Sequence, residues 1–320
     1  MASFLDFPFD FDSNSNLLND SLELALERLP NQVREAITSD VVFLGCYPHL
    51  SLLRKSMLFL KSRRSSIAMT QWLEHQKGFP RLHDAQKLQI WVTFENRRIP
   101  NKHVDLGIGF DFHERDSKFL YMPLIFFYID FLSNGASYVR HPVSFSELQQ
   151  PRFDFEIPVS QRRFACAFIN NPDPVRLRFI DALRNFGEVD IFGRSTGNYV
   201  KNKIEITNEY RFTVCFENDL FPGYVTEKPL EAWLGKAVPI YWGLDNAGIL
   251  NPEAVINCSD FPSLQDAVTF VGSIKERFDL LEKYIRQPLF SRNLEAPKLV
   301  DFLYHGILNS GKFNHLLSPI

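Results

Sequence analysis

The stretch RFTVCFENDLFPGYVTEKPLEAWLGKAVPIYWG, residues 211–243, is the most informative part of the sequence. It begins with an apolar run over 211–216, which predicts a strand that ends in polar residues. A Pro-Gly loop follows, then an amphipathic segment over 227–236 and a second apolar run over 237–242. Strand, helix and strand in this order predict a βαβ unit within a parallel sheet.

The start of the predicted helix offers groups that bind an anion. Thr226 stands where an N-cap residue is expected, and Glu227 and Lys228 fall in the first turn. Pro229 is tolerated there because the first amides of a helix have no intrahelical partner. Free amides, the positive end of the helix dipole and the Lys228 ammonium suit a diphosphate. A surface helix that happens to begin with Glu-Lys has the same spacing, so both interpretations stay open here.

Outside this stretch, short apolar runs alternate with amphipathic segments, which is typical of α/β proteins. In the first half the sequence predicts strands at 41–46, 88–94 and 104–110, and helices at 50–60 and 70–76. In the second half it predicts strands at 163–169, 189–192 and 254–258, and helices at 174–186, 263–286 and 296–308.

The domain organisation follows from a change in sequence pattern at residues 134–162. This segment contains three prolines, and its polar residues follow neither helical nor strand periodicity. We interpret this segment as a connection between domains. The prediction is an N-terminal domain over 1–156, a C-terminal domain over 157–290, and a helical segment over 291–320 that packs back toward the first domain. Such α/β domains bind ligands outside the carboxyl ends of their strands.

Composition excludes several classes of protein. Of 320 residues, 45% are hydrophobic and 23% are charged, a globular balance that excludes disordered, collagen-like and coiled-coil chains. The formal net charge of −3 argues against a nucleic-acid partner.

The expected location is the cytosol. The four cysteines are far apart and form no C-x-x-C, which favours reduced thiols. The N-terminus lacks the basic region of a signal peptide, and the longest apolar run, 119–132, is too short for a transmembrane segment. A basic amphipathic segment at 54–64 favours a solvated helix face, with peripheral contact to an anionic membrane as the alternative.

With these residues in view, the run FEN…YVTEK…A…GKAVPIYWG resembles the signature of the α-1,3/4-fucosyltransferases, glycosyltransferase family ten. The resemblance extends over most of residues 88–262. The positions that match at the expected spacing are Phe216, Glu217, Asn218, Tyr224, Thr226, Glu227, Lys228, Ala232, Val238, Pro239, Tyr241, Trp242 and Gly243.

The resemblance implies a GT-B fold, in which two Rossmann-like αβα domains face each other across a cleft. It implies inverting transfer of L-fucose from GDP-fucose to the 3- or 4-hydroxyl of GlcNAc or Glc in an oligosaccharide. The expected acceptor is an N-acetyllactosamine-like or other glycan, as in protein or lipopolysaccharide glycosylation. Neither a metal nor another cofactor is expected.

The resemblance also implies the donor-binding residues. Lys228 and Arg194, which follows the 189–192 strand, are expected to stabilise the departing GDP. Glu227 is expected to hold hydroxyls of the fucose or the ribose, and Tyr224 to bond the phosphate or pack on the sugar. Taken without the resemblance, Arg194 is a surface-loop arginine paired with a carboxylate. The residues expected to shape the same pocket are Glu217, Asn218 and Thr226.

The expected general base is Glu95, at the carboxyl end of the 88–94 strand. Similar enzymes carry T-G-E-N…P followed by D-x-x-x-x-F-D, and Asp105, Phe110 and Asp111 fit that pattern. A carboxylate near an apolar cleft can have its pKa raised toward neutral pH, which suits a base.

The sequence departs from this pattern in three ways. Phe94 replaces the glycine, Pro100 comes one residue late, and Arg97 stands where some members carry a second Glu that can be the base. The alternative for Glu95 is a strand-end carboxylate paired with Arg97 or Arg98.

Two other motifs are interpreted as incidental. The D-x-D at Asp10 and Asp12 has no strand before it, so we predict no metal site there. Gly107 and Gly109 lack the third glycine of a nicotinamide-binding fingerprint. Two rival functions stay open: a GT-B transferase that uses another nucleotide sugar, and a non-catalytic relative that binds a glycan or nucleotide.

Overall fold

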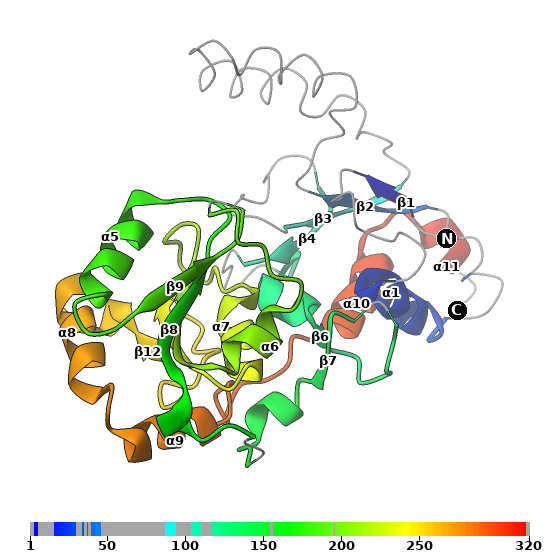
Figure 1. The fold of residues 1–320 in the computed structure, drawn as a ribbon. Helices are drawn as coiled ribbons and strands as arrows, with labels where there is room; N and C mark the ends of the chain where they lie inside the picture. Colours follow the sequence, from blue (N-terminus) through cyan, green and yellow to red (C-terminus); the bar gives the residue numbers. More distant parts are fainter. Residues whose placement is uncertain are drawn as a thin grey trace, which may run out of the picture. The chain divides into compact units, whose positions relative to one another are not determined.

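The structure is a computed structural model. It describes residues 3–5, 16–29, 34, 37, 40–45, 87–93, 104–110, 117–137, 139–153, 156–194 and 196–317. The chain divides into two compact units (Figure 1). Unit 1 comprises 1–109, 113–122 and 297–320, and unit 2 comprises 110–112 and 123–296.

Unit 1 contains a five-stranded sheet in the order β1-β2-β3-β4-β5, and every neighbouring pair is parallel. Its described strands are β1 (Ser3–Leu5), β2 (Val41–Gly45), β3 (Leu88–Val92), β4 (Leu106–Gly109) and β5 (Phe119–Tyr121). The side chains of β3 and β4 are buried along their whole length, as parallel strands covered on both faces require.

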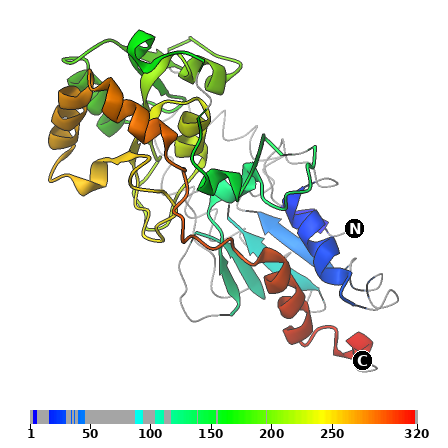
Figure 2. The same cartoon turned by 90° about the horizontal axis from the view of Figure 1, so that it is seen from below.

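Two helices of unit 1 come from opposite ends of the chain. They are α1 (Leu17–Leu26) and α10 (Leu299–Asn309), with the short α11 (Asn314–Leu317) after them. Helices α1 and α10 contact each other, although they lie at opposite ends of the sequence (blue and red in Figure 2). Arg28 Nη1, just after α1, lies 2.7 Å from Asp301 Oδ1 of α10. A Cβ added to Gly306 would lie 2.3 Å from Leu106 Cδ1, so α10 packs tightly on β4.

Unit 2 contains a second five-stranded parallel sheet, in the order β12-β11-β10-β8-β9. Its strands are β8 (Arg163–Phe168), β9 (Val189–Phe192), β10 (Tyr210–Phe216), β11 (Val238–Trp242) and β12 (Ile256–Asn257). Its helices are α5 (Pro174–Leu183), α6 (Lys203–Thr207), α7 (Glu227–Leu234), α8 (Leu264–Ile274) and α9 (Phe278–Arg286). A small parallel pair, β6 (Ile129–Asp130) and β7 (His141–Ser144), belongs to the same unit.

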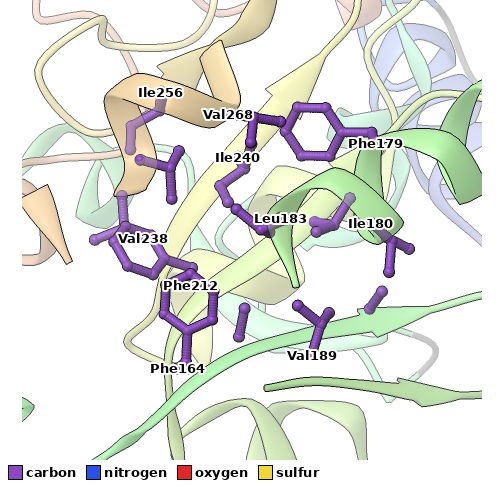
Figure 3. Packing of buried hydrophobic residues seen from close by; sticks show 14 of the residues in the cluster. Phe164, Phe179, Ile180, Leu183, Val189, Phe212, Val238, Ile240, Ile256 and Val268 are labelled. Atoms are coloured by element: carbon purple, nitrogen blue, oxygen red, sulfur yellow. The ribbon is translucent and has the colours of Figure 1, made fainter. Parts of the chain in front are cut away.

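The main core of unit 2 lies between its sheet and helices α5, α8 and α9 (Figure 3). Phe212, Val214 and Phe216 alternate along β10 and point into this core. Phe216 lies 4.7 Å from Phe179 of α5, measured between ring centroids. The intervening Thr213 and Cys215 help to line the pocket on the other face, where α6 and α7 lie. Both faces of β10 are therefore covered.

The segment 134–162 differs from the predicted connection between domains. It belongs to unit 2, where β7 pairs with β6 and the Arg152 guanidinium lies 3.9 Å from the Trp233 ring centroid. The buried Arg162 donates to the carbonyl oxygens of Ile157 and Lys236. The division into units therefore places 123–156 with the second unit rather than the first, and 297–320 with the first.

The predicted helix over 263–286 is wrong in one respect, because the structure has two helices there. Helix α8 ends at Ile274 and α9 begins at Phe278. Arg211 Nη1 donates to the Lys275 carbonyl in the break, and the Arg211 guanidinium lies 4.9 Å from the Phe278 ring centroid. The turn lets Leu281 and Ile285 of α9 reach the core that α8 also covers.

Among the described residues, no helix combines the length and hydropathy that crossing a bilayer requires.

Candidate active site

A pocket of about 170 Å³ lies at the carboxyl ends of β8 and β10. These strands are neighbours in the sheet, but the chain continues from β8 to β9 toward one edge of the sheet and from β10 to β11 toward the opposite edge. This reversal of direction is the topological switch point, where open α/β sheets bind ligands. The lining residues are Phe168, Asn170, Asn171, Arg176, Lys203, Thr207, Thr213, Val214, Cys215, Phe216, Asn218, Glu227, Lys228, Glu231 and Ala232.

The first turn of α7 is fixed from behind by Glu217. The Glu217 side chain is 0% exposed, and its Oε1 accepts a hydrogen bond of 2.9 Å from the Thr226 amide. Its Oε2 accepts from the Thr226 hydroxyl at 2.7 Å and from Lys228 Nζ at 2.9 Å. Glu217 thus lies behind the pocket lining and holds the residues that begin the helix.

Thr226 occupies the N-cap position that the sequence predicts, but its hydroxyl accepts no hydrogen bond from a backbone amide of the first helical turn, as a capping hydroxyl would. It donates to Glu217 and accepts a hydrogen bond of 2.9 Å from Lys228 Nζ. Thr226 is therefore a buried link between Glu217 and Lys228.

Lys228 is the cation at the helix start, and 22% of its side chain is exposed. Burial by itself disfavours the ammonium form, but Glu217 and Glu227 outweigh this effect and raise the Lys228 pKa above its usual value. Glu227 Oε1 lies 3.9 Å from Lys228 Nζ, and both residues line the pocket. The pocket therefore holds a permanent cation at neutral pH, placed beside the first amides of α7.

Arg176 is a second cation of the pocket, and the sequence analysis missed it. Helix α5 begins at Pro174, and the N-cap residue Asp173 before it accepts hydrogen bonds from the Val175 and Arg176 amides. This start places Arg176 in the first turn, 6% exposed. Its Nη2 donates to the Phe216 carbonyl at 2.9 Å, and Arg176 is one of the residues that line the pocket. Burial lowers the Arg176 pKa, yet an arginine stays charged.

A third group of charges stands around Glu231, whose side chain is 9% exposed. Glu231 Oε2 lies 2.7 Å from Lys203 Nζ, and Oε1 lies 3.5 Å from Arg140 Nη2 and 3.7 Å from His141 Nε2. Burial by itself raises the Glu231 pKa, but His141, Lys203 and Arg140 together lower it to about 2. Glu231 and Lys203 both line the pocket.

The remaining predicted donor-binding residues lie at different depths. Asn218 lines the pocket with Glu227 and Lys228. Tyr224 is buried and packs edge-on against Phe110, with ring centroids 5.0 Å apart. Arg194 is exposed and lies outside the lining residues, although its amide donates to Asn170 Oδ1 at 3.2 Å.

Gly193 explains why the loop after β9 comes so close to the pocket. Its φ is +122°, and an added Cβ would lie 2.3 Å from the Ile169 carbonyl oxygen. Only glycine allows this approach without strain. It brings the amide of Arg194 onto Asn170 in the pocket wall.

The predicted base Glu95, and Asp111, which belongs to the same matched pattern, lie outside the described residues. Asp105, which the resemblance also matched, precedes β4 at the amino end of that strand. Its carboxylate pairs with Lys312 Nζ at 2.9 Å and accepts a hydrogen bond from the Gln89 amide. Asp105 thus connects the C-terminal segment to the sheet of unit 1.

In the part of the chain that the structure describes, no three His, Cys, Asp or Glu side chains gather into a possible metal site. The D-x-D at Asp10 and Asp12 lies outside those residues, so the metal-free site stays a prediction.

This chain is similar to one known protein family and to named fucosyltransferases. Residues 159–287, which include the whole pocket, match the family model described as glycosyltransferase family 10 (fucosyltransferase), C-terminal part. An α-(1,3)-fucosyltransferase of Helicobacter pylori is 30% identical over 262 residues, covering 71% of this chain and 54% of that protein. A 4-galactosyl-N-acetylglucosaminide 3-α-L-fucosyltransferase of Homo sapiens is 36% identical over 111 residues, covering 32% of this chain and 29% of that protein. The chain thus spans about half the length of the bacterial relative and less of the human one.

Solved structures with the same fold include an α1,3-fucosyltransferase with GDP. Its TM-score is 0.66 at 22% identity, covering 98% of this chain and 91% of that chain. The same comparison with a GDP-fucose complex gives a TM-score of 0.65 at 22% identity, covering 96% of this chain and 90% of that chain. These matches confirm the predicted α/β fold of GT-B type, and the family match confirms the resemblance seen in the sequence.

Proposed function

We propose, from the glycosyltransferase family 10 domain that residues 159–287 form, that this chain is an inverting fucosyltransferase with GDP-fucose as its donor. The observation that carries the proposal is the cationic pocket at the switch point of this domain. The acceptor is the 3- or 4-hydroxyl of GlcNAc or Glc in an oligosaccharide. Neither a metal nor another cofactor takes part.

The pocket has the chemistry that a nucleotide diphosphate requires. Lys228 and Arg176 are charged at neutral pH, and the amides that begin α7 stand beside Lys228. The Glu227 carboxylate also lines the pocket and can accept hydrogen bonds from sugar or ribose hydroxyls. The side-chain amides of Asn170 and Asn218 add donors and acceptors to the same wall.

The reaction is a direct displacement at the anomeric carbon of fucose. The acceptor hydroxyl forms the new C–O bond as the bond to the phosphate oxygen breaks, and the hydroxyl proton passes to Glu95. The electron pair of the broken bond leaves on GDP, whose added charge Lys228, Arg176 and Arg194 stabilise. Glu217 and Thr226 hold Lys228 in place, and buried Tyr224 supports the loop before α7.

The proposed compartment is the cytosol. The cysteines within the described residues, Cys166, Cys215 and Cys258, are free and buried, as a reducing compartment favours. Peripheral contact with a membrane through 54–64 is the alternative. That segment lies outside the described residues.

The experiment that tests the donor is binding and turnover with GDP-fucose, GDP-mannose and UDP-glucose. We expect GDP-fucose to raise the melting temperature most, because a ligand stabilises the folded state in proportion to how tightly it binds. We also expect GDP release and a fucosylated product when GlcNAc-containing glycans are added in the presence of excess EDTA, which removes the divalent metals that a metal-dependent transferase would need. Turnover with UDP-glucose alone, or loss of activity in EDTA, contradicts the proposal.

A second experiment tests the base. Glu95→Gln should lower kcat by roughly 10²–10⁴-fold, because general bases contribute about that much, while the Kd for GDP stays unchanged. Asp105→Asn is the matched control, since Asp105 pairs with Lys312 at the amino end of β4. Full turnover by Glu95→Gln would remove Glu95 from the mechanism. A protein that binds GDP-fucose but transfers nothing to any glycan would support the non-catalytic alternative.

A further inference from the structure

The charges around Glu231 are unbalanced. This one carboxylate faces three basic side chains, those of Lys203, Arg140 and His141. Lys203 and Arg140 already exceed its single negative charge before any proton is added to His141. The cluster therefore carries surplus positive charge, and Lys203 is the basic side chain of the cluster that lines the pocket, together with Glu231.

The structure holds Lys203 at the pocket wall. Lys203 is the first residue of α6, and Asn202 before it accepts a hydrogen bond from the Glu205 amide. Helix α6 packs closely on the end of α7, because a Cβ added to Gly235 would lie 2.4 Å from Thr207 Cβ. The Lys203 side chain is 31% exposed, whereas that of its partner Glu231 is 9% exposed. The Lys203 side chain is therefore accessible to a ligand, while the helix from which it projects is held in place.

We propose that Lys203 is a further donor-binding residue that contacts the diphosphate, and that Glu231 is the positioning residue that directs the Lys203 ammonium into the pocket. This inference rests on the proposed function, because it takes the pocket to be the nucleotide-sugar site.

The chemistry of the donor favours the diphosphate as the partner of Lys203. The diphosphate is the ionised part of a nucleotide sugar at neutral pH, and an ammonium with surplus charge binds an ionised oxygen best. The pocket of about 170 Å³ is smaller than the roughly 300–1,000 Å³ of typical ligand sites. Lys203, Arg176 and Lys228 line this one small volume, so a diphosphate bound there lies close to all three.

Glu231 orients Lys203 without taking part in binding. Its Oε2 holds Lys203, while Oε1 faces Arg140 and His141, which come from the segment that leads into β7. Arg140 in turn lies 5.2 Å from the Tyr128 ring centroid. Because Arg140 and His141 take one oxygen of the carboxylate, the other is directed at Lys203.

The test is calorimetric binding of GDP to four proteins: the wild type, Lys203→Met, Lys203→Arg and Lys201→Met. We expect Lys203→Met to weaken GDP binding about 10-fold, the lower end of what a charge-assisted hydrogen bond contributes. Lys203→Arg keeps the charge and should restore binding to within about 3-fold of the wild type. Lys201→Met is the matched control, since Lys201 is exposed, lies two residues away and is outside the pocket lining.

Kinetics separate binding from a structural effect. Lys203→Met should raise the KM for GDP-fucose in parallel with the Kd for GDP and leave the acceptor KM unchanged. Glu231→Gln should weaken GDP binding in the wild-type background but add nothing to Lys203→Met, because Glu231 acts through Lys203. If Glu231→Gln does not fold, the Lys203 variants decide the question alone.

Two outcomes overturn the inference: GDP affinity of Lys203→Met equal to that of the wild type, or a loss that Lys201→Met shows equally. A wild-type protein that binds GDP but transfers no fucose refutes the proposed function and leaves the comparison of Lys203 variants intact. A wild-type protein that does not bind GDP refutes both.

Discussion

Replacing Glu217 by glutamine should destabilise unit 2, although Glu217 does not itself line the pocket. The carboxylate of Glu217 is fully enclosed and receives the Thr226 amide, the Thr226 hydroxyl and the Lys228 ammonium at 2.9, 2.7 and 2.9 Å. A glutamine has one acceptor oxygen for these three donors. Its amide nitrogen must then face either the Thr226 amide or the Lys228 ammonium, and both are donors.

The size of the effect follows from the burial of the two partners. Removing one partner of a buried ion pair costs about 3–5 kcal/mol, and a charge-assisted hydrogen bond contributes about 1.5–3 kcal/mol. Lys228 is 22% exposed and can regain some water, which reduces the loss. We therefore expect Glu217→Gln to cost about 2–4 kcal/mol, which for a domain of this size lowers the melting temperature by roughly 5–15 °C.

The assay is a thermal melt of Glu217→Gln, Lys228→Met, the double variant and Glu227→Gln. Glu227 is the matched control, because it lies in the same turn, 3.9 Å from Lys228, but is 20% exposed. Glu227→Gln should melt within about 2 °C of the wild type, because its ion pair with Lys228 is long and partly exposed, and such pairs contribute little. It should nevertheless weaken donor binding, since Glu227 lines the pocket.

The double variant tests the pairing directly. Once Lys228 is methionine, no buried ammonium is left without its carboxylate, so adding Glu217→Gln should cost less than it does in the wild type. The reasoning is refuted if Glu217→Gln melts like the wild type, or if the two substitutions add without coupling. Either result would mean that Glu217 does not hold Lys228 in solution.

Three further predictions concern acid stability, a loop and the missed cation. The pKa of Glu231 is lowered from 4.5 to about 2, so above pH 4.5 its carboxylate stabilises the folded state by up to roughly 3 kcal/mol. This stabilisation is lost as the pH falls from 4.5 toward 2. The difference in melting temperature between the wild type and Glu231→Gln should therefore disappear over that pH range. Gly193→Ala should lower the melting temperature and weaken GDP binding, because the added Cβ would meet the Ile169 carbonyl oxygen. Gly197→Ala is the control: Gly197 has φ +72° but nothing within 4 Å of an added Cβ, so the substitution should lower the free energy of unfolding by only about 1 kcal/mol. Equal effects of the two substitutions would contradict this prediction. Arg176→Met should weaken GDP binding by at least roughly 10-fold in calorimetry, since it removes a charged donor from the pocket, and an unchanged Kd would exclude Arg176 from the donor site.

The strands of unit 2 were predictable because each is a short apolar run between polar or glycine-containing segments. The predicted 189–192 strand agrees with β9 at both ends, and the predicted 211–216 strand differs from β10 by one residue. Buried parallel strands give this signal because both of their faces must be apolar. The break between α8 and α9 had no such signal, since apolar residues continue at helical spacing across it and tertiary contacts of Arg211 stabilise the turn.

The site was predictable in its location more than in its roles. The run from Glu217 to Lys228 indicated a strand end beside a helix start, and the structure places the pocket there. Burial decides which of those residues faces a ligand, however, and burial depends on the fold. Glu217 is enclosed and Lys228 is accessible, although both are charged residues of the same motif and were expected in the same pocket. Arg176 was missed because it comes from α5, whose first turn meets β10 only when the sheet forms.

The cations of the pocket share a design that bears on how a diphosphate would enter it. Lys228 is backed by buried Glu217, Lys203 by buried Glu231, and Arg176 by the carbonyl oxygens of Asn171, Phe216 and Glu217. Each cation is thus already oriented before a ligand arrives, which reduces the entropy lost on binding. Each also keeps hydrogen-bonding capacity for a phosphate oxygen, because an ammonium has three donors and a guanidinium has five. The arrangement favours a site that binds its anion with little rearrangement of side chains, and in which removing a backing carboxylate disturbs binding as surely as removing the cation itself.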